Sequence, residues 1–104
     1  MGNDEKADPW LIEDEVVIDH PTGLHARPAI AFTKCAKTFA AADIQIRGGH
    51  DGPWIDAKSI VKVMGLKLKS GAVLSLRARG DQAGDAVTAL KSLVQRKFDE
   101  PVDS

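Results

Sequence analysis

The fold of this 104-residue chain is decided at the segment TGLHARP, residues 22–28, where a strand ends and a helix begins. The residues before it, EVVID at 15–19, are short, apolar and β-branched, as is typical of a strand. After it, apolar residues recur at helical spacing from about 26 to 40. The segment therefore predicts a strand-to-helix junction with His25 at the start of the helix.

The rest of the chain predicts three more strands and two more helices. The strands are expected at 43–47, 54–56 and 73–79, and the helices at 60–64 and, after Asp81 as cap, along an apolar stripe that reaches Phe98. The first two of these strands flank a Gly-rich turn and form a hairpin.

This order indicates an α+β fold, a two-layer open-faced sandwich in which a four-stranded antiparallel sheet carries three helices on one face. The other face can remain solvated. We expect a flexible leader at 1–14, one domain at 15–98 and a frayed tail at 99–104. Within the leader, Trp10 either packs on the domain surface or contacts a partner.

Composition excludes several classes of protein. The net charge of −1 argues against nucleic-acid binding, which usually requires a basic excess. No run approaches the ~20 apolar residues that a membrane span needs, so membrane insertion is not expected. The single cysteine, Cys35, cannot form an internal disulfide, which favours the cytoplasm, and its spacing indicates a partly buried packing role.

The junction offers the chemistry of an anion site. The first N–H groups of a helix lack partners within it, and the helix dipole stabilises an anion there by roughly 0.3–1 kcal/mol. With His25 as N-cap, Ala26 and Arg27 supply free amides. The Arg27 guanidinium can hold a phosphate oxygen, and Pro28 lies where its missing N–H does no harm.

An alternative start of the helix follows from the proline. Because the residue before a proline avoids helical angles, Arg27 could cap the helix with Pro28 as its first residue, which leaves fewer amides facing His25. In either case a neutral imidazole can attack phosphorus, and a covalent phosphohistidine splits one transfer into two.

The string GLHARP at 23–28 resembles the active-site signature of the HPr family, the histidine-containing phosphocarriers of the bacterial phosphoenolpyruvate-dependent sugar phosphotransferase system. The resemblance covers about residues 15–98. It implies that His25 accepts a phosphoryl group on Nδ1 from phosphorylated enzyme I and passes it to an enzyme IIA domain. Arg27, with the helix start at Ala26 and Pro28, would stabilise that group. The chain would be a monomeric, cytoplasmic carrier without a cofactor rather than a free-standing turnover enzyme.

A second segment, KSIVKVM at 58–64, resembles the second helix of the family with its regulatory serine. Ser59 matches the serine that a dedicated HPr kinase phosphorylates in some members. Ile60, Val61 and Met64 match the apolar patch that binds partners. A phosphate on Ser59 would be stabilised by its own helix start and would repel acidic partner surfaces. The structural alternative is that Ser59 only caps this helix.

Other functions remain compatible with the sequence. The chain could be a regulatory interaction module that acts through phosphorylation of Ser59 and the surface from Ile60 to Met64. Relatives also serve in nitrogen-linked phosphorelays or as components of a dihydroxyacetone kinase. A metal site built from His20, His25 and His50 is disfavoured because their spacing is irregular and no supporting ligand set is present, so no metal is expected.

Overall fold

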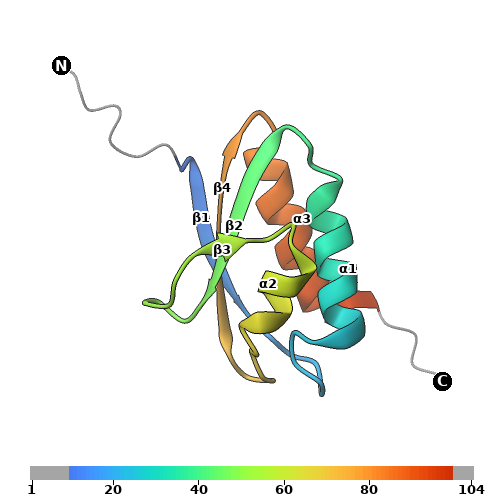
Figure 1. Ribbon diagram of the computed structural model, residues 1–104. Helices are drawn as coiled ribbons and strands as arrows, with labels where there is room; N and C mark the ends of the chain where they lie inside the picture. Colours follow the sequence, from blue (N-terminus) through green and yellow to red (C-terminus); the bar gives the residue numbers. More distant parts are fainter. Residues whose placement is uncertain (1–9, 100–104) are drawn as a thin grey trace.

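The chain folds as one antiparallel sheet covered on one face by helices (Figure 1), in a computed structural model that describes residues 10–99. The strands are β1 (Ile12–Val17), β2 (Ala42–Gly48), β3 (Ile55–Asp56) and β4 (Val73–Gly80), in the spatial order β1-β4-β2-β3. The helices are α1 (Ala26–Lys37), α2 (Ile60–Gly65) and α3 (Ala83–Gln95), and a 3-10 turn, η2 (Lys97–Asp99), follows α3. The predicted α+β sandwich of order β-α-β-β-α-β-α is confirmed.

Strand β4 pairs with both β1 and β2, and this pairing sets which side chains face the helices. Val16 of β1 lies opposite Leu74 of β4, and Ile46 of β2 lies opposite Leu76. Because side chains alternate between the faces of a strand, these four residues share one face. All four are buried, so this is the face that the helices cover.

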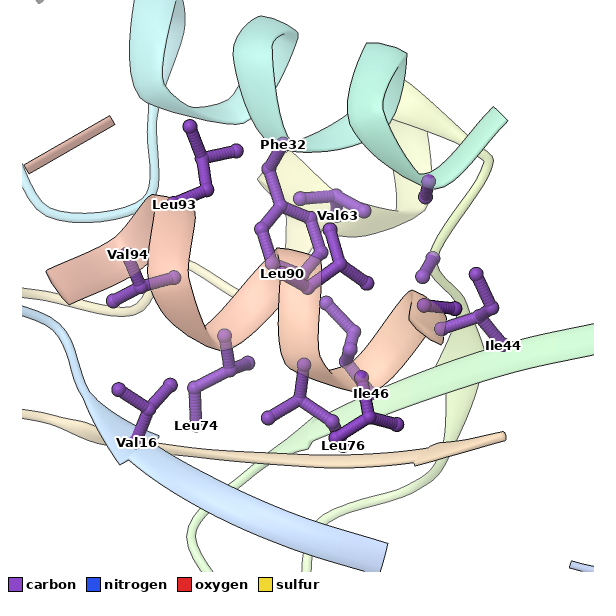
Figure 2. Close-up of a cluster of buried hydrophobic side chains, with 14 of the residues drawn as sticks. Val16, Phe32, Ile44, Ile46, Val63, Leu74, Leu76, Leu90, Leu93 and Val94 are labelled. Carbon is purple, nitrogen blue, oxygen red and sulfur yellow. The ribbon is translucent and has the colours of Figure 1, made fainter. Parts of the chain in front are cut away.

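The hydrophobic core lies between that face and the three helices (Figure 2). Each helix contributes at least one fully buried side chain: Phe32 from α1, Val63 from α2 and Leu90 from α3. Burial of a side chain of this size stabilises the fold by roughly 1.5–3 kcal/mol. The short helix α2 is therefore held by packing, because six residues are too few for a helix to be stable alone.

The uncovered face of the sheet carries two tryptophans stacked with arginines. The guanidinium carbon of Arg77 lies 4.3 Å from the ring centroid of Trp10 and 4.2 Å from that of Trp54. Arg79 stacks on Trp10 at 4.5 Å. Arg47 stacks on Trp54 at 4.3 Å. Such contacts contribute about 0.5–1 kcal/mol each at exposed sites, so Trp10 packs on the surface of the domain.

Strand β1 begins earlier than the sequence pattern predicts. It starts at Ile12 instead of residue 15 and ends at Val17, and the amide of Leu11 already donates to the carbonyl of Ala78 at 3.0 Å. The acidic residues 13–15 conceal the strand pattern, and an edge strand tolerates charge because it has a neighbour on one side only. Residues 1–9 of the predicted leader and 100–104 of the predicted tail lie outside the described residues.

Helix α1 ends at Lys37, about three residues before the predicted end. The hydroxyl of Thr38 donates to the carbonyl of Cys35 at 2.7 Å, and side chains of this kind compete with the helical backbone bonds. Cys35 is half-buried and packs against the core, as predicted. Its burial raises the pKa of the thiol, which makes the reactive thiolate scarce.

Helix α3 starts one residue later than expected, with Gln82 rather than Asp81 as its N-cap. The Gln82 side chain accepts a hydrogen bond from the amide of Ala41 at 2.9 Å, so a distant segment holds this end of the helix. The prediction that the helix carries Phe98 is wrong, because α3 stops at Gln95 and Phe98 lies in η2 with left-handed backbone angles; its side chain is nevertheless buried.

Asp14 ties strand β1 to helix α3. Its Oδ2 lies 2.9 Å from Nζ of Lys91, and its Oδ1 accepts the amide of Glu15 at 2.8 Å. The Lys91 hydrogen bond, followed by that of Glu15, lowers the pKa of Asp14 below its usual range. A lowered pKa means that the stabilisation is present above the pKa of the unfolded chain and is lost as the pH falls through the folded pKa.

We therefore expect Asp14→Asn to lower the melting temperature at neutral pH and to have a smaller effect at pH 2, because protonation of the folded carboxylate removes the ion pair as the pH falls. Asp14 is 44% exposed, so solvent screening limits the ion pair to less than about 1 kcal/mol. That corresponds to a shift of less than about 4–8 °C for a domain of this size. Glu13→Gln is the control, because it removes the same charge from the other face of the strand. An equal shift at both pH values for Asp14→Asn would contradict the prediction.

Candidate site at the start of helix α1

His25 is the N-cap of α1, with extended backbone angles of φ −144° and ψ 159°. The alternative in which Arg27 caps the helix is wrong, because α1 already begins at Ala26. Ala26 has a φ of +50°, in the left-handed region that a non-glycine residue rarely adopts. Such a conformation costs on the order of 1–3 kcal/mol and persists only where the surroundings impose it.

The surroundings of the site consist of two buried anchors. Leu24, just before His25, is fully buried, and its amide donates to the carbonyl of Leu68 at 2.9 Å. Pro28, in the first turn, is also fully buried. Residues 25–27 between them are exposed. The structure thus exposes His25 and Arg27 at the start of α1, on a short segment whose two ends are fixed.

The electrostatics of this segment favour an anion. The first turn of α1 has no acidic side chain, and its last turn carries Lys34 and Lys37. The basic residues therefore match the negative end of the helix dipole, while the positive end at His25 is left uncompensated within the helix. Among the described residues, the His25 side chain makes no capping hydrogen bond, so the ring is not committed to the helix start.

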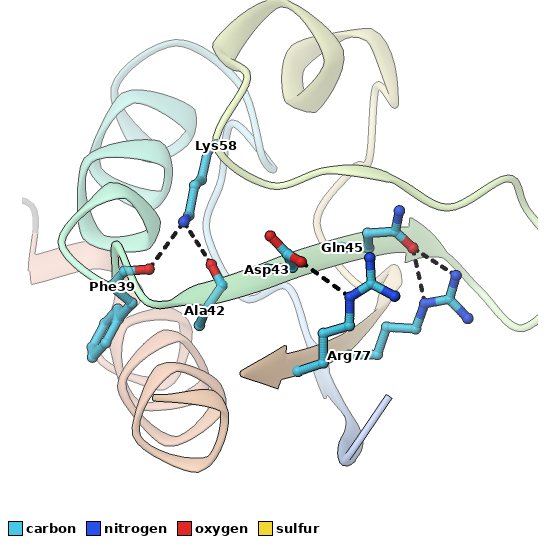
Figure 3. A network of polar contacts seen from close by, with 7 residues as sticks. Phe39, Ala42, Asp43, Gln45, Lys58 and Arg77 are labelled. Atoms are coloured by element: carbon cyan, nitrogen blue, oxygen red, sulfur yellow. Dashed lines mark hydrogen bonds and ion pairs between the residues drawn. The ribbon is translucent and has the colours of Figure 1, made fainter. Parts of the chain in front are cut away.

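Ser59 caps α2, as predicted, and its Oγ accepts the amide of Lys62 at 3.3 Å. The preceding residue, Lys58, donates from Nζ to the carbonyl of Phe39 at 2.9 Å and to that of Ala42 at 2.6 Å (Figure 3). These bonds hold the start of α2 against the segment that follows α1. Ser59 therefore lies near the end of α1 that is remote from His25.

The structure does not bring the two predicted sites together. Helices α1 and α2 lie side by side and run in opposite directions, so the end of α2 lies toward the start of α1 (Figure 1). The bond between Leu24 and Leu68, which lies just after α2, agrees with this arrangement. Ser59 and His25 therefore lie toward opposite ends of the pair formed by α1 and α2.

The predicted apolar patch is exposed only in part. Val61 is 76% exposed, whereas Ile60 and Met64 are partly buried against the core. Ile30 of α1 is also apolar and 49% exposed, although it was not predicted as part of a partner-binding surface. The signal was present, since Ile30 does not fall on the buried stripe of its helix. Exposed apolar residues on two neighbouring helices are suited to contact with another protein.

The three histidines of the chain have separate environments. His50 pairs with Glu15 at 2.9 Å, and His20 contacts Thr22 within its own turn. Across residues 10–99, no group of three His, Cys, Asp or Glu side chains could hold a metal ion. In the same part of the chain, no helix has the length and apolar character required to cross a bilayer.

The fold and the site together define a class, the small α+β sandwiches that expose a histidine in the positive field of a helix start. The crystal structure of HPr from Thermoanaerobacter tengcongensis has the same fold, with a TM-score of 0.80 and 37% identity over 88% of this chain and 100% of that chain. The Bacillus subtilis protein Crh, a catabolite repression protein, aligns with a TM-score of 0.63 and 32% identity over 84% of this chain and 97% of that one.

Sequence comparison gives the family. Residues 12–96 match the family model described as the PTS HPr component phosphorylation site. Phosphocarrier protein HPr of Vibrio cholerae is 40% identical over 86 residues, which cover 83% of this chain and 98% of that protein. HPr of Pseudomonas aeruginosa is 37% identical over 87 residues, 83% of this chain and 93% of that protein. The chain belongs to the HPr family of phosphocarriers of the phosphotransferase system.

Proposed function

We propose that this chain accepts a phosphoryl group on His25 from phosphorylated enzyme I and passes it to an enzyme IIA domain. The observation that carries the proposal is the exposed His25 at the uncompensated positive end of α1, with no capping bond from its ring within residues 10–99. A lone pair of the ring attacks phosphorus as the bond from phosphorus to the donor nitrogen breaks. The same exchange in reverse releases the group to the acceptor.

The site would stabilise a phosphoryl group only moderately, which suits a carrier. The helix start stabilises an anion by roughly 0.3–1 kcal/mol, and a charge-assisted hydrogen bond from Arg27 adds about 1.5–3 kcal/mol. Residues 25–27 are all exposed, so solvent screens these interactions further. Modest stabilisation on an open surface holds the group without trapping it, and both partners can reach the imidazole.

The direct test is incubation of the purified chain with phosphoenolpyruvate and enzyme I of the phosphotransferase system. We expect one acid-labile phosphate per chain, and its loss when an enzyme IIA domain is added. A chain that gains no acid-labile phosphate would contradict the proposal. Comparison of IIA domains from sugar-transport and nitrogen-linked systems as acceptors then identifies the pathway.

The contribution of Arg27 to the rate of phosphoryl transfer can be measured. We expect Arg27→Gln to lower kcat/KM for phosphorylation by enzyme I about tenfold, because one charge-assisted hydrogen bond on an exposed surface is worth about 1.4 kcal/mol, which is a tenfold change in rate. Lys34→Gln removes the same charge from the last turn of α1 and is the matched control. Equal rates for the two variants would show that the effect is one of net charge alone.

A second candidate function is regulation through Ser59. The observation that favours it is the position of Ser59 as N-cap beside the exposed Val61, so that a phosphate there would place negative charge next to the apolar patch. Incubation with ATP and extracts of the source cell is expected to give acid-stable phosphate that Ser59→Ala abolishes. Acid-stable phosphate on another residue, or none, would contradict this role.

A further inference from the structure

The turn that leads to His25 is closed by a backbone hydrogen bond and reinforced by a histidine side chain. The carbonyl of His20 accepts the amide of Gly23 at 2.8 Å, which closes a four-residue turn. In addition, Nδ1 of His20 accepts the amide of Thr22 at 3.2 Å and lies 3.0 Å from the Thr22 hydroxyl. Asn and Asp side chains make the same bond, to an amide two residues on, in Asx turns.

This turn joins two firmly held points of the backbone. At one end, Ile18 is fully buried and is bonded through its amide to Ala72 at 2.8 Å and through its carbonyl to Gly71 at 2.7 Å. At the other end, Leu24 is fully buried and bonded to Leu68 at 2.9 Å. The shape of the turn between them therefore sets the direction in which the chain arrives at Leu24, and His25 follows directly.

The imidazole of His20 is itself held in orientation. Its ring lies edge-on to that of Phe98, with 5.9 Å between centroids and 74° between planes, and Phe98 is buried. This contact ties the turn to η2 at the far end of the described chain. The bond from the Thr22 amide requires Nδ1 to be free of a proton, so the acceptor tautomer carries its hydrogen on Nε2.

From these contacts we propose that His20 is a positioning residue for phosphoryl transfer: its Nδ1 holds the turn at residues 20–23 so that His25 is presented in a fixed position. The inference rests on the phosphocarrier function proposed above. A displacement of about 1 Å of a reacting group can lower a rate about 100-fold. Because the buried anchors remain when the side-chain bond is lost, we expect a smaller effect, about tenfold.

Three variants separate the bond of His20 from its packing. His20→Asn keeps an acceptor for the Thr22 amide and removes the ring. His20→Phe keeps a ring against Phe98 and removes the acceptor. His20→Ala removes both. With enzyme I and phosphoenolpyruvate, we expect kcat/KM for phosphorylation of His25 to stay within about twofold of the natural chain for Asn, and to fall about tenfold for Phe and Ala.

Rescue by Asn alone distinguishes positioning from structural support. Three results would overturn the proposal: His20→Phe is phosphorylated as fast as the natural chain, His20→Asn is as slow as His20→Ala, or all three variants keep the full rate. Thermal unfolding shows whether each variant is folded. If His20→Phe is not folded, the comparison of His20→Asn with His20→Ala is sufficient to test the proposal. Failure of the natural chain itself to take phosphate would instead contradict the proposed function, and His20 would then have no transfer to support.

Discussion

His25→Ala is expected to reduce the acid-labile phosphate that enzyme I and phosphoenolpyruvate transfer to this chain to an undetectable level. The methyl group has no lone pair with which to attack phosphorus, so the covalent step is lost rather than slowed. Because the natural ring makes no capping hydrogen bond within the described part of the chain, its removal should leave α1 intact. We expect the melting temperature to stay close to that of the natural chain, as measured by circular dichroism.

His50→Ala is the matched control for this experiment. It also removes an exposed imidazole, here one that pairs with Glu15 on the strand edge, and it should take up phosphate at the natural rate. Persistence of acid-labile phosphate in His25→Ala would show that another residue carries the group. A variant that has lost its helical signal would indicate a structural role for His25 instead.

Gly23→Ala is expected to lower the stability of the fold strongly. Gly23 has a φ of +71°, and a Cβ there would lie 2.3 Å from the carbonyl oxygen of Leu68 and 2.9 Å from Cα of Lys69. Both contacts are with backbone, which cannot rotate away. The left-handed conformation alone costs about 1–2 kcal/mol, and we expect a total of about 3 kcal/mol once the overlap is added. This would lower the melting temperature by roughly 12–24 °C.

Gly71→Ala isolates the conformational part of that effect. Gly71 also has a positive φ, of +93°, but among the described residues nothing lies within 4 Å of a Cβ built there. We expect a loss of only about 1–2 kcal/mol, measured as the shift in the urea midpoint. Equal losses of unfolding free energy for Gly23→Ala and Gly71→Ala would mean that the close approach of Leu68 to Gly23 does not contribute to the effect. Gly23→Ala should also slow phosphorylation of His25, since the bond from Leu24 to Leu68 is next to the clash.

Much of the candidate site could be predicted from the sequence because its parts depend on neighbouring residues. The helix start at His25 is indicated by the apolar repeat beyond it and is compatible with a proline in the first turn, where the missing N–H does no harm. The cap at Ser59 depends on an amide three residues away. The alternative cap at Arg27 had a local argument as well, and the left-handed Ala26 next to the cap was not visible in the sequence.

Other features depend on segments that are distant in the sequence. Gln82 caps α3 in place of Asp81, and its side chain bonds to Ala41, which lies 41 residues away. The start of β1 at Ile12 is specified by its pairing with β4 and not by its own acidic residues. Patterns within a window of ten residues carry no information on such contacts, because each depends on which elements lie side by side in the folded chain.

The junction at residues 22–28 shows which features depend on local sequence and which depend on tertiary contacts. Hydrophobic periodicity, a proline and a histidine were sufficient to predict a strand, a turn and a helix with a reactive imidazole at its start, because these preferences act over one turn of helix. The position of that imidazole was decided by tertiary structure. Leu68, far along the chain, approaches the backbone so closely at Gly23 that only a glycine fits, and it fixes the residue before His25.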